Sequence, residues 1–167
     1  MKLQLATAKD SPRLNKFFNQ SLIPGPVELR FDRSGDYFAP YKIQSDSHST
    51  FMLEDDKGDI IASASLLFKQ GWINGEPQKI CYATDLRVAP KRKAIIHWTK
   101  HYLPALEQAK QEFGVNYFFS AVPKLQTQAF NAFVSPRSNK RELPRYYLFR
   151  NYGAVNIHGL LPFTTKP

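Results

Sequence analysis

The first fifty residues alternate between short apolar runs and helix signals. Residues 2–7 (KLQLAT) favour a short strand. Asp10-Ser11-Pro12 then predicts a helix start, because a capping side chain followed by proline suits the first helical turn. Pro24-Gly25-Pro26 should end this helix, and a second short helix is predicted over residues 37–43. The apolar face of the first helix consists of Leu14, Phe17, Phe18 and Leu22.

Residues 50–88 have the pattern of three consecutive antiparallel strands. β-rich runs over 50–54, 60–69 and 79–88 are separated by a polar turn at 55–59 and by Asn74-Gly75. Asn-Gly is a strong hairpin signal, because both central positions of that turn require a positive φ. Strict alternation along the third strand places two sets of side chains on opposite faces. One set is Ile80, Tyr82, Thr84, Leu86 and Val88, and the other is Cys81, Ala83, Asp85 and Arg87.

A long helix and a further strand are predicted next. Apolar residues recur every three or four positions over 95–113, Pro104 interrupts the pattern, and Gly114 is a natural helix end. Residues 115–122 are almost continuously apolar, which predicts a central, buried strand. The length of the helix suits a right-handed parallel β-α-β crossover.

The remaining residues complete the predicted architecture. A helix is expected after Pro123, a basic loop over 135–144, and strands over 146–152 and 154–163. The chain is therefore predicted to be a single α/β domain over residues 1–167. Its mixed sheet would have six or seven strands, mostly antiparallel with one parallel crossover, and helices on both faces.

Composition narrows the class of protein. The 167 residues are 43% hydrophobic and 22% charged, which are globular proportions. No apolar run reaches the roughly 20 residues that cross a bilayer, and a single cysteine, Cys81, excludes an internal disulfide framework. A cytoplasmic location without a membrane partner is the expectation. The net charge of +9 should attract phosphate, whether in nucleic acid, in an anionic membrane or in a phosphorylated cofactor.

The order of these elements and one phrase in the sequence resemble a known family. The phrase runs from Asp85 to Lys93 (DLRVAPKRK), between a predicted strand and a long helix. Together with the chain length and the opening LATAKD, it resembles the GNAT superfamily, the GCN-related N-acetyltransferases. The resemblance covers nearly the whole chain, from Leu3 to Phe163.

The resemblance implies acetyl-CoA, or another acyl-CoA, as co-substrate, with no metal. In this family the co-substrate binds where the strands matching 79–88 and 115–122 separate. The pantetheine strand would be Leu86, Arg87 and Val88, and a phosphate-binding turn would lie at 93–98. Basic charge would come from Lys91, Arg92 and Lys93, and further cofactor-binding positions would be Ala94, Ile95, Ile96 and Gln126.

The sequence also departs from the family pattern. Glycines that let the backbone approach a phosphate are replaced by Ile96 and Trp98. The alternative interpretation is that Ile95, Ile96 and Trp98 are core residues of an amphipathic helix. A tyrosine that commonly protonates the leaving thiolate is replaced by Phe133, so Tyr147 or a neighbouring tyrosine would have to substitute.

Asp85 is the first candidate for the general base, since transfer to an amine requires a proton acceptor. The alternative is a structural, ion-paired carboxylate, and Glu54 is a weaker candidate base. His97 and His101 lie one turn apart, but no further ligand motif accompanies them, so no metal site is predicted.

Three functions follow from these observations. The first is direct acyl transfer from acetyl-CoA to a primary amine of a small molecule or peptide. The second is a non-catalytic GNAT-fold module that binds partners, for example as a homodimer. The third is nucleic-acid binding, which is not expected because no binding motif accompanies the charge.

Overall fold

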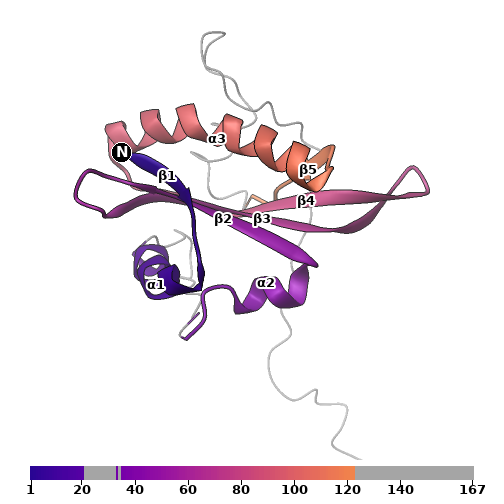
Figure 1. Cartoon of the computed structure of the whole chain (residues 1–167), viewed down its shortest axis with the longest axis horizontal. Helices are drawn as coiled ribbons and strands as arrows, with labels where there is room; N and C mark the ends of the chain where they lie inside the picture. The colour runs from indigo at the N-terminus through magenta and orange to yellow at the C-terminus, as the bar shows by residue number, and fades with distance from the viewer. Residues whose placement is uncertain (21–32, 34, 123–167) are drawn as a thin grey trace, which may run out of the picture.

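The computed structural model describes residues 1–20, 33 and 35–122. In this part of the chain, one sheet is covered by helices on both of its faces (Figure 1). This is the mixed α/β architecture that the sequence predicts. The expected elements after Pro123 lie outside the described residues.

The sheet has five strands in the order β1-β2-β3-β4-β5. The first four are antiparallel neighbours, and β5 is parallel to β4. The meander and the parallel crossover are therefore confirmed. The strands are β1 (Lys2–Leu5), β2 (Ser47–Glu54), β3 (Ile60–Ile73), β4 (Glu76–Val88) and β5 (Tyr117–Phe119).

The β3–β4 hairpin follows the chemistry of its turn. Asn74 and Gly75 have φ values of 52° and 84°, which is the pair of positive angles that the turn requires. The two strands continue past the first residue of β2, whose partner on β3 is Phe68. They form the arm that projects on the right of Figure 1.

Helices pack on the sheet as two separate layers. The long helix α3 (Arg92–Phe113) lies on one face, whereas α1 (Ser11–Asn19) and α2 (Ala39–Gln44) lie on the other (Figure 1). The 3-10 turn η1 (Ala8–Asp10) precedes α1. Gly114 ends α3 with φ 63°, and the helix runs through Pro104 without a break. Among the described residues, no helix has both the length and the apolar character needed to cross a membrane.

Each face of the sheet has its own apolar core. On the α3 side, Trp98, Tyr102 and Leu106 pack on residues from β2, β3 and β4. On the other side, Leu14 and Phe18 of α1 and Tyr41 of α2 pack on Met52 and Leu67. The predicted apolar face of α1 is confirmed for Leu14, Phe17 and Phe18, which are all buried.

The prediction of a long, buried strand over 115–122 is wrong in two respects. The strand β5 has only three residues, and the side chains of Tyr117 and Phe119 are 46% and 41% exposed. Val115, by contrast, is fully buried in the α3-side core. The apolar run therefore combines Val115, which is buried just before β5, with two exposed aromatic residues on β5 itself. It does not form a strand that is enclosed on both faces.

Candidate functional site

The pairing between the two parallel strands ends before β4 does. Their last paired residues are Tyr82 on β4 and Phe119 on β5. Strand β4 continues to Val88, and over residues 83–88 it pairs with β3 but has no β5 partner in the described part of the sheet. Among the residues that the structure describes, this stretch therefore has one free edge, where backbone N–H and C=O groups can bind another extended chain.

A β-bulge lies within this stretch of β4. Ser65 is opposite Thr84 and Ser63 is opposite Arg87, so Asp85 and Leu86 together face the single residue Ala64. Asp85 is in the left-handed region with φ 53°. Aspartate tolerates this conformation better than most residues with a Cβ.

The bulge overturns the predicted alternation of faces along β4. Leu86 and Val88 pack against the α3-side core, where Cys81 and Ala83 also lie. Asp85 and Arg87 instead point toward the α1 and α2 layer, where they contact Tyr41 and Phe18 respectively. Strict alternation is wrong beyond Thr84, because one extra residue in a strand moves every later side chain to the opposite face.

The register also shows which backbone groups point to the free edge. The Ala89 N–H donates to the Ile61 carbonyl at 2.8 Å, so Ala89 and then Arg87 turn their backbone groups toward β3. The backbone groups of Leu86 and Val88 consequently point the other way, toward the gap beside β5. One of them, the Leu86 carbonyl, accepts a hydrogen bond of 3.0 Å from the Arg87 guanidinium.

The N-terminus of α3 follows directly after this strand. Lys91, Arg92 and Lys93 are exposed there, and neither a side-chain cap nor an acidic residue occurs in the first turn. Free N–H groups at a helix N-terminus and nearby cations favour an anion. The first turn of α3 is thus able to hold phosphate, with Lys and Arg beside it.

The predicted phosphate-binding turn at 93–98 is not a turn in the structure. The helix begins at Arg92, so Lys93, Ala94, Ile95 and Ile96 all lie within its first turns. Trp98 is buried and stacks on Tyr102 with ring centroids 5.1 Å apart, as expected for a core residue. Ile95 and Ile96 are about half exposed, so the interpretation of all three as core residues holds only for Trp98.

Asp85 is held by a network of buried and half-buried polar groups. Its Oδ2 accepts hydrogen bonds from the Tyr41 hydroxyl at 2.5 Å and from Arg33 Nη2 at 2.8 Å. The Tyr41 hydroxyl also accepts from Arg33 Nη1 and from Ser65 Oγ, each at 2.9 Å. Burial, with the neighbouring Tyr37 and Asp85, raises the pKa of Tyr41, so its hydroxyl keeps its proton. The sequence analysis did not identify Arg33 or Tyr41, because neither residue belongs to a recognisable motif.

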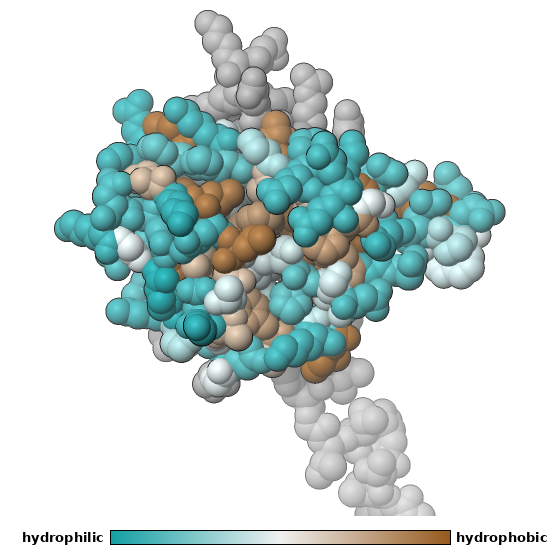
Figure 2. Space-filling model, in the orientation of Figure 1, coloured by the Kyte–Doolittle hydropathy of each residue, from teal (hydrophilic) through white to brown (hydrophobic). Residues whose placement is uncertain are grey.

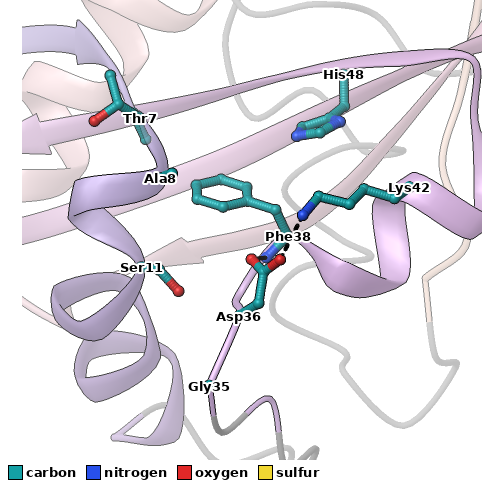
Figure 3. Close-up of a pocket in the computed structure, with 9 residues that line it drawn as sticks. Thr7, Ala8, Ser11, Gly35, Asp36, Phe38, Lys42 and His48 are labelled. Carbon is teal, nitrogen blue, oxygen red and sulfur yellow. Dashed lines mark hydrogen bonds and ion pairs between the residues drawn. The ribbon is translucent and has the colours of Figure 1, made fainter.

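A cavity of about 340 Å³ opens on the same face of the sheet (Figure 3). The Phe38 ring is stacked on the His48 ring at 5.6 Å, and Asp36 is paired with Lys42 at 2.6 Å. Burial, and secondarily the Lys42 charge, lowers the pKa of His48, so its imidazole is neutral near pH 7. The cavity is lined by Ala6, Thr7, Ala8, Ser11, Gly35, Asp36, Phe38, Lys42 and His48.

Other residues singled out in the sequence have clear surroundings. Glu54 is ion-paired with Arg13 at 2.5 Å. Burial raises the pKa of the Cys81 thiol to about 12, which suits an inert core residue. No cluster of three metal-ligating side chains occurs within residues 1–20, 33 and 35–122. Gln126 and Tyr147 lie outside the described residues.

Comparison with solved structures identifies the fold. An aminoglycoside 6'-N-acetyltransferase from Acinetobacter baumannii superimposes with a TM-score of 0.58 at 14% identity, covering 91% of this chain and 99% of that one. Glucosamine-6-phosphate N-acetyltransferase from Arabidopsis thaliana gives 0.54 at 17% identity, with coverage of 89% and 98%. A predicted acetyltransferase from Clostridium acetobutylicum, solved with acetyl-CoA, gives 0.58 at 18% identity, with coverage of 90% and 95%.

These similarities define the class of fold. The chain has the fold of the GNAT acetyltransferases, as the sequence predicts. No protein-family model and no curated protein matches the sequence. At these levels of identity the superpositions establish the architecture, and the chemistry has to be argued from the residues of this chain.

Proposed function

We propose that this protein is an acyl-CoA-dependent N-acyltransferase that transfers an acetyl group from acetyl-CoA directly to a primary amine. The observation that carries the proposal is that β4 runs on beyond Tyr82 without a β5 partner, up to the uncapped N-terminus of α3. Acetyl-CoA would supply an acetyl thioester that is already activated for transfer. The free edge of β4 and the first turn of α3 are the groups of this chain that would hold it.

The free edge of β4 suits the pantetheine arm. Pantetheine is an extended chain with two amides, and Leu86 and Val88 direct backbone groups toward the gap that it would enter. A backbone N–H in this stretch would also polarise the thioester carbonyl. The side chains of Leu86 and Val88 are packed in the α3-side core, which fixes the backbone in place.

The first turn of α3 suits the pyrophosphate. The exposed side chains of Lys91, Arg92 and Lys93 can each neutralise one phosphate oxygen. Free backbone N–H groups replace the glycine-rich turn of the family. Because α3 begins at Arg92, Ile96 lies one turn beyond these N–H groups and Trp98 lies in the core, so neither side chain has to occupy the phosphate position.

Asp85 is the proposed proton acceptor for the amine. Its Oδ2 is occupied by Tyr41 and Arg33, whereas its Oδ1 has no hydrogen bond within the described residues. The amine nitrogen would bond to the thioester carbonyl carbon, the carbon–sulfur bond would break, and the amine proton would pass to Asp85 directly or through water. The departing thiolate would take a proton from Tyr147, which remains a proposal from the sequence.

The acceptor would approach from the α1 and α2 side of the sheet. Asp85 points to this side, and the cavity between the start of α1 and the start of α2 is on the same side (Figure 3). The cavity offers the Asp36 carboxylate and the neutral His48 imidazole, which suit an amine or a hydroxyl group. A small molecule or a peptide with a primary amine is the proposed class of acceptor.

Calorimetry with acetyl-CoA and with CoA tests the proposal most directly. Saturable binding in the micromolar range is expected, together with release of CoA thiol when a panel of small amines is added. Lys93→Gln at the start of α3 should weaken CoA binding roughly three- to tenfold, the value of one charge-assisted contact. Lys79→Gln removes the same charge from the exposed start of β4 and should leave binding unchanged. Absence of CoA binding would contradict the proposal and favour a non-catalytic module.

A further inference from the structure

The bulge at Asp85 needs an external support. A left-handed φ is unfavourable for a residue with a Cβ, and an extra residue in one strand interrupts regular pairing. The side chain of Asp85 is only 12% exposed, so its negative charge also needs a partner. Both requirements are met from outside the strand, by Tyr41 of α2 and by Arg33.

The hydrogen bonds around Tyr41 run in one direction. The hydroxyl donates to Asp85 and accepts from Arg33 and Ser65, which uses its full capacity. Because the Ser65 hydrogen points to Tyr41, Thr50 must be the donor in the 2.8 Å contact between Thr50 and Ser65. The network thus connects Tyr41 of α2 directly to β3 and β4, and to β2 through Ser65.

Arg33 is itself held by aromatic rings. Its guanidinium carbon lies 4.7 Å, 5.0 Å and 5.1 Å from the ring centroids of Phe18, Tyr37 and Tyr41. The side chain is only 11% exposed, and its fork reaches both the Tyr41 and Asp85 oxygens. A planar, weakly hydrated guanidinium suits this position, because it can stack on the rings and donate two parallel hydrogen bonds.

We infer that Arg33 and Tyr41 are positioning residues, which hold the Asp85 bulge in the shape that turns the Leu86 and Val88 backbone toward the CoA gap. The inference rests on the proposed function for the identity of the ligand. In the described part of the chain, the hydrogen bonds of both side chains reach Asp85 but not the backbone of Leu86 or Val88. Both residues therefore act on the gap through Asp85, which directly precedes Leu86 in the strand.

The test compares Tyr41→Phe and Arg33→Met with a matched control, Arg13→Met. Arg13 also links the α1 side of the sheet to a carboxylate, Glu54, but it does not contact the bulge. In the free protein, hydrogen exchange at Arg87 and Ala89, whose N–H groups point toward β3, reports on the bulge without any ligand. CoA affinity measured by calorimetry reports on the gap, and the melting temperature reports on stability.

Tyr41→Phe and Arg33→Met should accelerate exchange at Arg87 and Ala89 and weaken CoA binding about tenfold, as for the loss of one charge-assisted hydrogen bond. Arg33→Lys should lie between the wild type and Arg33→Met, because lysine retains the charge but not the fork. Arg13→Met should lower the melting temperature and change neither readout.

A lower melting temperature for Tyr41→Phe, with unchanged exchange at Arg87 and Ala89 and CoA affinity within twofold of wild type, would overturn the inference and leave these residues a structural role. If the wild type itself binds no CoA, the proposed function fails. The exchange measurement on the free protein then decides the inference alone: faster exchange in Tyr41→Phe than in Arg13→Met supports it, and equal exchange overturns it.

Discussion

Replacing Val88 by proline would remove a single backbone N–H from the free edge of β4. The Val88 N–H points away from β3, so its loss breaks no hydrogen bond of the ladder. Proline is tolerated on an unpaired strand edge, and the preceding Arg87 lies in the extended strand that proline favours. One neutral hydrogen bond is worth a net 0.5–1.5 kcal/mol, which corresponds to a loss of CoA affinity of roughly two- to twelvefold.

Isothermal titration with CoA measures this effect, and two further variants identify its cause. Val88→Ala trims the side chain that packs against the α3-side core but keeps the N–H, so it should lose less CoA affinity than Val88→Pro does. Arg87→Pro removes an N–H that points toward β3 and should instead lower the melting temperature. Equal CoA affinity for Val88→Pro and Val88→Ala would refute the assignment of the Val88 backbone to the ligand.

Three predictions concern stability. Tyr37→Phe should leave the melting temperature unchanged or raise it, because the buried Tyr37 hydroxyl has no partner among the described residues; a clear decrease would show that it has one. Gly71→Ala should cost about 1 kcal/mol, because its Cβ would lie 2.4 Å from Ile80 Cδ1, and adding Ile80→Val should restore most of the loss in a chemical denaturation experiment. Hydrogen bonds from the Thr7 backbone and hydroxyl lower the pKa of Asp10. Asp10→Asn should therefore lower the free energy of unfolding by about 1 kcal/mol at pH 7. The difference in unfolding free energy between wild type and Asp10→Asn should vanish as the pH falls below about 4, because Asp10 then becomes protonated in the wild type.

The surface in Figure 2 illustrates a limit of hydropathy as a guide to the site. Hydrophobic residues gather in the middle of this side of the molecule, between the α3 layer and the α1 and α2 layer, with hydrophilic residues above and below. Exposed apolar residues occur both away from the proposed gap, as Trp72 does on the β3–β4 arm, and on the elements beside it, as Ile96 and Phe119 do, so exposure does not single out the gap. The gap is marked by backbone geometry, which the side-chain pattern of one strand does not encode.

The sequence predicted which stretch of the chain contributes to the candidate site, but not which distant side chains meet there. The phrase from Asp85 to Lys93 spans the end of β4 and the start of α3, which follow one another in the chain. Arg33 and Tyr41 could not be linked to Asp85 from the sequence, because they lie 52 and 44 residues away and meet it only through the packing of α2 on the sheet.

The sequence alone determined the features that depend on neighbouring residues. Helical spacing, the Asn74-Gly75 turn and the Gly114 helix end were correct because local periodicity and backbone preference act over a few residues. Only the tertiary structure decided the bulge at Asp85, the two orientations that follow it, and the point where β5 leaves β4. These depend on how two strands pair and on which buried groups satisfy a charge, and both are properties of contacts between residues that are distant in the chain.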